Sequence, residues 1–132
     1  MNWQATTHAL LRIMTGFLFI PHGYQKLFGL GDSGPRDSEV ALVAALIELI
    51  GGTLILLGFQ TRWVAFVCSG FMAAAYFLAH AGDAFLPLLN RGELAVLYCF
   101  VFLYLWAHGS GAYSIDWLLE QRRRKARALG RS

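Results

Sequence analysis

The sequence predicts an all-α protein that is embedded in a membrane. Of its 132 residues, 57% are apolar and only 14% are charged, and the mean hydropathy is +0.50. A soluble domain usually carries about 25% charged residues, whereas a bilayer accepts apolar side chains without a penalty from water. At about 20 residues per span, the chain has room for four helices, which we expect to form an antiparallel four-helix bundle.

Four apolar runs, each bounded by turn-forming residues, give the expected spans. They lie at about residues 7–30, 39–58, 62–81 and 93–111, and they form one membrane domain over residues 1–120. The turn-rich segment 31–38 follows the first span, and Ser38 is a candidate N-cap for the second. Pro21 removes a backbone donor from the first span and predicts a bend there.

Residues 121–132 are expected to form a basic, disordered cytoplasmic tail that follows a short amphipathic helix lying on the membrane surface from Ser114. The tail holds six of the eleven Lys and Arg residues. Arg62 would join them on the inner side, against Lys26, Arg36 and Arg91 outside, so the positive-inside rule places both termini in the cytoplasm. Because membrane topology explains these charges, nucleic acid is not expected as a partner.

Ionisable residues within the spans are the candidates for function. Arg12, His22 and Lys26 interrupt the first span, and Glu48 lies near the middle of the second. Such groups cost ~2.5–3.5 kcal/mol on insertion scales and therefore indicate a functional site or a buried partner. With a rise of ~1.5 Å per residue, His22 lies about 6 Å and Lys26 about 12 Å outward of the midplane. A carboxyl at the depth of Glu48 must be protonated, paired with a base or open to water.

Helical spacing groups several polar and aromatic residues on shared faces. Phe19, His22 and Lys26 share a face of the first span, and Tyr76 and His80 share one of the third. Asn90 and Glu93 lie just before and at the start of the fourth span, at a similar depth. If these faces turn inward, they form one pocket in the outer half of the membrane.

Plainer explanations stay open for some of these residues. Lys26 and Glu93 lie near helix ends, from which their side chains can reach the headgroups, and His80 can be an interfacial residue without a partner. Arg12 lies toward the inner side and keeps its proton, so it needs a carboxylate, backbone carbonyls or the inner headgroups.

No metal site is predicted. Cys68 and Cys99 are too far apart in the sequence for a cysteine-rich zinc centre. The spacing of the His and Glu residues supports neither a metal at His22, Glu48, His80 and Glu93 nor haem between His22 and His80.

Three stretches of the chain resemble the DoxX family, over about residues 10–116. They are RIMTGFLFIPHGYQKLFG at Arg12–Gly29, ELIGGTLILLGFQTRW at Glu48–Trp63 and NRGELAVLYCFVFLYL at Asn90–Leu105. The resemblance implies a small four-helix protein of a bacterial-type inner membrane, associated with oxidoreductases. It also implies links to quinones, to phenolic compounds or to defence against oxidants, and it carries pocket residues over to Arg12, His22, Lys26, Glu48, Asn90 and Glu93.

From the residues and the resemblance together, we expect a pocket for a quinone or a phenolic redox molecule, with haem or metal less favoured. His22 and Glu48 are the expected catalytic residues, which exchange protons. A redox partner protein would supply electrons, and assembly as a homo-oligomer is open. The alternatives are a non-catalytic anchor subunit and a small protein that binds or transports a metal or solute. The expected ligand-binding residues are Lys26, Phe19, Tyr76, His80, Asn90 and Glu93, and Arg12 is expected to have a structural partner.

Overall fold

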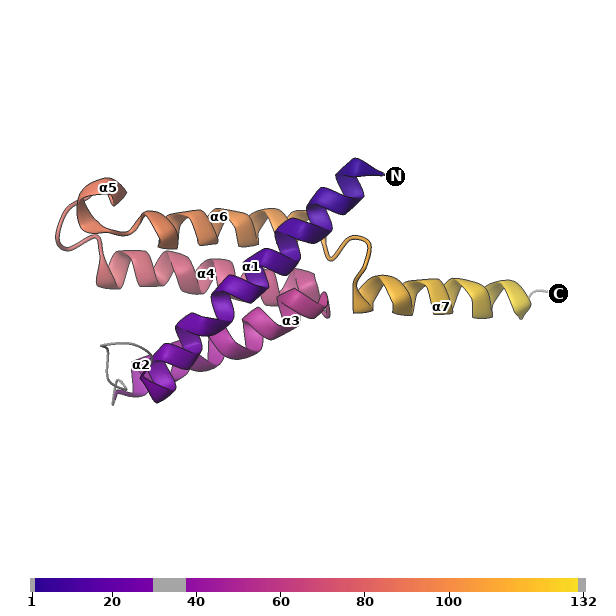
Figure 1. Ribbon diagram of the computed structural model, residues 1–132, viewed down its shortest axis with the longest axis horizontal. Coiled ribbons are helices and arrows are strands. Elements are labelled where there is room, and N and C mark those ends of the chain that lie inside the picture. The colour runs from indigo at the N-terminus through magenta and orange to yellow at the C-terminus, as the bar shows by residue number, and fades with distance from the viewer. Residues whose placement is uncertain (1, 30–37, 131–132) are drawn as a thin grey trace.

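The structure is a computed structural model that describes residues 2–29 and 38–130. Every regular element in these ranges is a helix, which confirms the all-α fold class. Figure 1 shows an elongated body of helices from which the C-terminal helix projects. Residues 30–37, which include the end of the first predicted span, most of the predicted turn and Arg36, lie outside the described residues.

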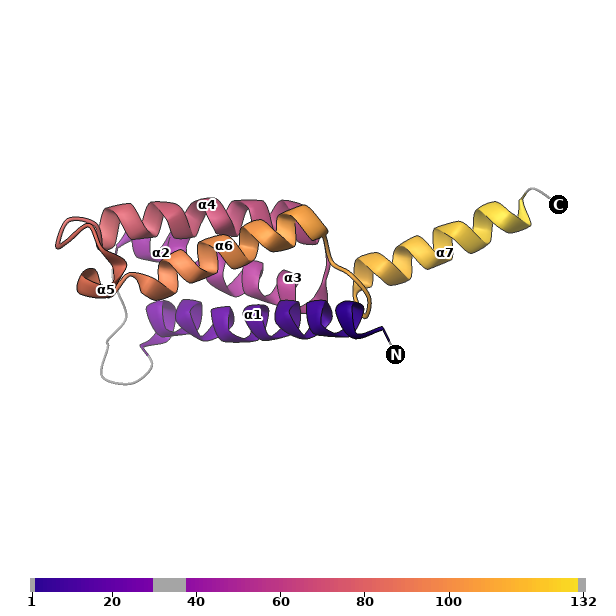
Figure 2. The same cartoon turned by 90° about the horizontal axis from the view of Figure 1, so that it is seen from above.

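The first span is one long helix, α1 (Trp3–Phe28). It begins at Asn2, whose Oδ1 accepts a hydrogen bond from the amide of Ala5 at 3.3 Å. This cap explains why the helix starts about a turn earlier than predicted. α1 continues through the exposed Pro21 as a single helix (Figure 2).

The second span is a continuous rod of three segments, which are α2 (Glu39–Leu46), the π-helical turn η1 (Ile47–Gly51) and α3 (Gly52–Leu57). The Oγ of Ser38 accepts a hydrogen bond from the amide of Ala41 at 3.1 Å, which confirms the predicted N-cap. The rod ends at Gly58, where a φ of 68° lets the chain reverse direction.

The third and fourth spans are α4 (Thr61–Ala79) and α6 (Glu93–His108), and the loop between them contains the single turn α5 (Pro87–Asn90). α4 and α6 run antiparallel, as do α1 and the rod (Figures 1 and 2). The spans therefore form two antiparallel pairs that cross at an angle. We call the end where α1 begins the α7 end, after the C-terminal helix described below, and the opposite end the α5 end.

The two pairs meet around aromatic side chains. Phe19 of α1 is 1% exposed, and its ring centroid lies 4.9 Å from that of Phe102 and 5.2 Å from that of Tyr98, both on α6. Such tilted ring pairs add to the stabilisation from buried area. The remaining buried members of this core are Ile55, Ala65, Cys68, Met72, Tyr76, Ala95 and Leu105.

Polar and apolar groups are distributed as in a membrane protein. Large apolar side chains point outward, among them Phe17, Ile50 and Phe100, while Arg12 and Glu48 are buried. This arrangement would be costly in water, and it is favourable in lipid. By length and composition, the rod and α4 can each cross a membrane with 19 residues, and α6 is a shorter apolar helix of 16 residues.

The C-terminal region differs from its prediction. α7 (Ile115–Leu129) begins at the expected N-cap Ser114, but it continues through the basic residues to Leu129. Residues 121–129 of the expected disordered tail are thus helical, because Arg, Lys, Ala and Leu are good helix formers and Glu120 pairs with Arg124 one turn later at 3.0 Å. α7 projects along the long axis of the molecule, whereas a helix on the membrane surface would lie across the ends of the spans (Figures 1 and 2).

Glycines bring α1 and the rod into close contact. A Cβ added to Gly16 would lie 2.5 Å from the backbone nitrogen of Leu56 and 2.6 Å from the carbonyl oxygen of Gly52. A Cβ added to Gly23 would lie 2.6 Å from the carbonyl oxygen of Ala45. Small residues allow this close approach of membrane helices, and backbone atoms cannot move aside as a flexible side chain can.

We expect Gly16→Ala to lower the free energy of unfolding by roughly 1–3 kcal/mol, the usual cost of overpacking. Thermal unfolding in detergent measures the effect. The matched control is Gly70→Ala in α4, where a Cβ would meet no atom within 4 Å. This control should keep or slightly raise the melting temperature, because alanine favours helix more than glycine does. Equal melting of Gly16→Ala and the unmodified protein would contradict the close contact.

Candidate functional site

A cleft of about 820 Å³ lies between the two helix pairs, in the half of the molecule nearer the α5 end. This volume falls within the range of about 300–1,000 Å³ that is usual for ligand pockets. The polar and aromatic side chains that line it come from all four spans and from residues next to their ends, and are His22, Lys26, Ser38, Glu39, Glu48, His80, Arg91, Phe19, Phe71 and Tyr98.

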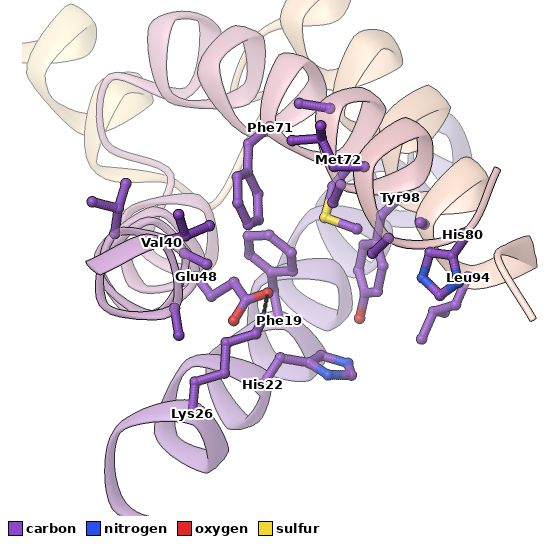
Figure 3. A pocket seen from close by; sticks show the side chains of 18 of the residues that line it. Phe19, His22, Lys26, Val40, Glu48, Phe71, Met72, His80, Leu94 and Tyr98 are labelled. Carbon is purple, nitrogen blue, oxygen red and sulfur yellow. Dashed lines mark hydrogen bonds and ion pairs between the residues drawn. The ribbon is translucent and has the colours of Figure 1, made fainter. Parts of the chain in front are cut away.

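An ion pair joins the two sides of the first helix pair within this cleft. Nζ of Lys26 on α1 donates a hydrogen bond to Oε1 of Glu48 on the rod. Glu48 is 4% exposed and belongs to the π-helical turn η1, and π turns are rare and frequent at functional sites. Figure 3 shows Glu48 pointing from the rod toward α1, with Lys26 and His22 beside it.

The second carboxylate oxygen of Glu48 has a different environment. Among the described residues, Oε2 is buried and has no hydrogen-bond partner. A buried carboxylate oxygen without a donor is costly. Because Glu48 lines the cleft, the hydroxyl group of a bound molecule could supply the missing donor.

Aromatic rings form the wall opposite Glu48. The ring of Tyr98 on α6 lies 6.2 Å from that of His22 in an edge-to-face arrangement. Tyr98 also packs against Phe19 at 5.2 Å and is 7% exposed. The structure thus brings Phe19, His22, Lys26 and Glu48 together, as the sequence predicted, and adds Tyr98 to them.

Two predicted binding residues, Tyr76 and Asn90, lie beside the cleft and support the loop before α6. The hydroxyl of Tyr76 donates to the carbonyl of Phe85. The side-chain amide of Asn90 donates to the Tyr76 hydroxyl at 3.1 Å and to the carbonyl of Ala84 at 2.7 Å. Its Oδ1 accepts from the amide of Gly92 at 2.8 Å. These bonds use both side chains to fix the backbone.

His80 and Glu93 lie in different places. His80 lines the cleft near the α5 end, and its Nδ1 lies 3.0 Å from the carbonyl oxygen of Asn90. Glu93 is the first residue of α6, is exposed, and does not line the cleft. The face of α6 that is buried carries Ala95, Tyr98, Phe102 and Leu105, and it is not the Glu93 face that the sequence suggested. Steps of three and four residues from Tyr98 are the signal that could have identified it.

Arg12 lies outside the cleft, at the α7 end, and is 0% exposed. Its guanidinium donates hydrogen bonds to four carbonyls, those of Ile55 and Leu56 in α3 and of Ser110 and Tyr113 in the loop before α7. The last carbonyls of a helix have no partner within it, so Arg12 satisfies the end of the rod.

Asp116 completes the structure around Arg12. Its two carboxylate oxygens accept hydrogen bonds from the amides of Gln60 at 2.9 Å and Thr61 at 3.1 Å, at the start of α4. Its own amide donates to the carbonyl of Gly58 at 3.0 Å. The start of α7 thereby caps α4, and the connections at the α7 end are fixed.

The described residues contain no group of three or more His, Cys, Asp and Glu side chains that could hold a metal ion. The chemistry available in the cleft is that of the carboxylates of Glu39 and Glu48, the ammonium group of Lys26, the guanidinium of Arg91, the hydroxyl of Ser38, imidazoles and aromatic rings. Such a set binds and exchanges protons with a molecule that carries hydroxyl or carbonyl groups.

A family model described as DoxX matches residues 7–81, which is more than half of the chain. The chain belongs to the DoxX family. The match covers α1, the rod and α4, and so includes Arg12, His22, Lys26 and Glu48. This DoxX protein is a membrane protein, as its apolar outer surface also indicates.

Several relatives match this DoxX protein over most of their length. An uncharacterized protein of Haemophilus influenzae is 41% identical over 116 residues, which are 82% of this chain and 87% of that protein. The inner membrane protein YqjF of Escherichia coli is 31% identical, with 84% and 90% covered. The putative oxidoreductase CatD of Bacillus subtilis is 31% identical, with 81% and 82% covered. No solved structure matches the chain.

We expect Lys26→Met to destabilise the protein by an amount near the lower end of ~3–5 kcal/mol, because it leaves the buried Glu48 without its partner. Glu48→Gln should cost less, since the side chain of Lys26 is 25% exposed and can reach water. The double variant Lys26→Met/Glu48→Gln should lose less stability than the two single changes added together. Thermal unfolding of the four proteins in detergent measures this coupling, and additive effects would contradict the ion pair.

Arg12→Lys should lower the free energy of unfolding by roughly 1.5–3 kcal/mol for each hydrogen bond lost. The single nitrogen of a lysine cannot reach all four carbonyls, which the three nitrogens of the planar guanidinium contact from different sides. The matched control is Arg62→Lys, at the same end of the molecule. Arg62 is exposed, and its Nη1 donates to the carbonyl of Trp106 at 3.2 Å. Chemical denaturation in detergent should show a loss for Arg12→Lys and little change for the control. A similar small change in both would contradict the role given to Arg12.

Proposed function

We propose that the cleft binds a quinone or a related phenolic redox molecule, and that the protein acts as an oxidoreductase-associated subunit of a bacterial plasma membrane. The observation that carries this proposal is Oε2 of Glu48, a buried acceptor without a donor among the described residues. A phenol or quinol has the matching donor, an O–H group on a flat apolar ring. The names of the relatives YqjF, an inner membrane protein, and CatD, a putative oxidoreductase, agree with this class.

The walls of the cleft suit an aromatic ring. Phe19 and Tyr98 offer ring faces and edges, against which an aromatic ligand packs favourably. Lys26 has three donors, of which one is used by Glu48. Another can reach the oxygen of a ligand and stabilise negative charge that develops on it. In this proposal Tyr98 takes the place of Tyr76 among the ligand-binding residues, and Lys26 keeps its expected place there.

Protons and electrons balance as follows. Reduction of a quinone to a quinol forms two O–H bonds and consumes two electrons and two protons. In this proposal a redox partner protein supplies the electrons, and His22 and Glu48 transfer the protons. In the reverse direction, one quinol hydroxyl gives its proton to Glu48 and the other gives its proton to His22, while the partner accepts the electrons. Both side chains line the cleft, as proton transfer to a bound ring requires.

The proposed orientation has both termini in the cytoplasm. The two ends of the chain lie at the α7 end (Figure 1), and α7 carries Arg122, Arg123, Arg124, Lys125 and Arg127. The positive-inside rule favours the cytoplasm for such a segment. The cleft would then lie in the outer half of the membrane.

A second candidate function is that of a non-catalytic subunit that anchors a partner. One observation favours it: residues 117–128 of α7 are all exposed, so this face of the molecule can contact another protein. A protein with this second function should bind neither a quinone nor a quinol, and that result would distinguish the second candidate from the first.

Binding of a small benzoquinone, and of its quinol, tests the proposal. We expect the purified protein in detergent to bind one molecule per chain in equilibrium dialysis. The double variant Lys26→Met/Glu48→Gln should bind at least tenfold more weakly, because a hydrogen bond to a charged group contributes ~1.5–3 kcal/mol. The control Asp83→Asn changes an exposed carboxylate at the α5 end, outside the cleft, and should bind as the unmodified protein does. No binding of either redox form to the unmodified protein would overturn the proposal.

A further inference from the structure

The cleft is open on one side, between the rod and α4. These two helices are joined by a short turn at the α7 end and diverge toward the α5 end (Figure 1). Nearer the α7 end the rod and α4 are in close contact, since a Cβ on Gly51 would lie 2.7 Å from Sγ of Cys68. Near the α5 end the gap is bordered by Val40 of the rod, which is 75% exposed, and Leu78 of α4, which is 85% exposed, with the exposed Ser38 and Glu39 at the start of the rod.

The cleft and a second cavity follow one another along the seam between the rod and α4, and we call the two together the crevice. The second cavity, of about 350 Å³, lies between the same two helices and nearer the α7 end. On α4 its residues Val64, Val67 and Cys68 are followed at helical spacing by Phe71 and Ala75, which line the cleft. The two cavities therefore follow one another along the same helix faces. The second cavity is lined by Leu46, Ile47, Ile50, Gly51, Leu54, Trp63, Val64, Val67 and Cys68.

The crevice is polar at one end only. The cleft is lined by the polar side chains of His22, Lys26, Ser38, Glu39, Glu48, His80 and Arg91, whereas the second cavity is lined by apolar side chains, apart from the thiol of Cys68 and the indole N–H of Trp63. This distribution of polar and apolar side chains suits an amphiphile, which has a compact polar head and a long apolar chain. A water-soluble ligand without an apolar chain would need only the polar cleft and not the second cavity.

We propose that the ligand enters sideways from the bilayer, between the rod and α4, and that it is a quinone with a long hydrocarbon tail. This inference rests on the proposed function. The ring occupies the cleft beside Glu48, and the tail passes between Ala44 of the rod and Ala75 of α4, then lies in the second cavity toward Trp63. The tail thus stays in an apolar environment throughout, so binding does not require its transfer into water.

The experiment measures the binding of two ligands to variants with substitutions at two positions along the crevice. The ligands are a benzoquinone with a decyl tail and the same ring with a methyl group in place of the tail. Ala75→Phe narrows the side opening, and Ile50→Trp fills the second cavity from a position that is 56% exposed, where the fold tolerates a larger side chain. Gly70→Phe is the control, because it also adds a phenyl ring to α4, at a position where an added Cβ would meet no neighbouring atom within 4 Å. Affinity is read from the ligand-induced shift of the melting temperature in lipid nanodiscs, with ligand expressed per lipid.

We expect Ile50→Trp and Ala75→Phe to weaken binding of the tailed quinone at least tenfold. Ile50→Trp should change binding of the tail-free ring less than twofold, because it lies away from the polar cleft, and Gly70→Phe should change neither ligand. Equal binding of the tailed quinone to Ile50→Trp and to the unmodified protein would overturn the tail site while leaving the proposed function in place. Failure of the unmodified protein to bind either ligand, in both its quinone and its quinol form, would overturn both.

Discussion

The buried guanidinium of Arg12 fixes the end of the molecule from which the helices diverge. A cation without a partner would be costly within a membrane, yet four backbone carbonyls accept its hydrogen bonds. These carbonyls belong to the end of the rod and to the loop before α7, so one side chain of α1 joins three parts of the chain. Asp116 extends the arrangement to α4, whose first amides it caps. With the α7 end held in this way, the helix pairs are free to separate at the α5 end, and the separation forms the cleft.

Close packing on one side of α1 complements the open cleft on the other. Gly16 and Gly23 bring α1 against the rod with no room for a Cβ. This contact sets Lys26 within reach of Glu48 across the interface. The ion pair neutralises two charges that would otherwise oppose insertion, but it leaves Oε2 of Glu48 without a donor. The site thus combines a rigid, paired cation and anion with one unsatisfied acceptor, an arrangement suited to a ligand that donates a hydrogen bond.

Part of the site could be predicted from the sequence because its residues are unusual where they occur. His22, Lys26 and Glu48 interrupt apolar runs, and Phe19 shares a helical face with His22 and Lys26. Tyr98 could not be found in the same way. α6 is apolar on nearly every side, so hydrophobic periodicity does not identify its buried face, and the polar residue Glu93 led to the wrong one. Tyr76 and Asn90 were predicted to bind the ligand, but their hydrogen bonds go to the loop between α4 and α6.

The sequence by itself determined the membrane environment, the all-α fold class and the approximate spans, because the transfer of side chains and the end of a helix at glycine or proline are local properties. It also showed which polar residues need partners. Only the tertiary structure decided which partners they have: carbonyls for Arg12, Glu48 for Lys26 and a loop backbone for Asn90. Such pairings join residues far apart in the chain and depend on how the helices pack. The course of α7 was decided in the same way, because a basic helix can lie along a membrane or project from it, and the bonds of Ser114 and Asp116 to the preceding turns set its direction.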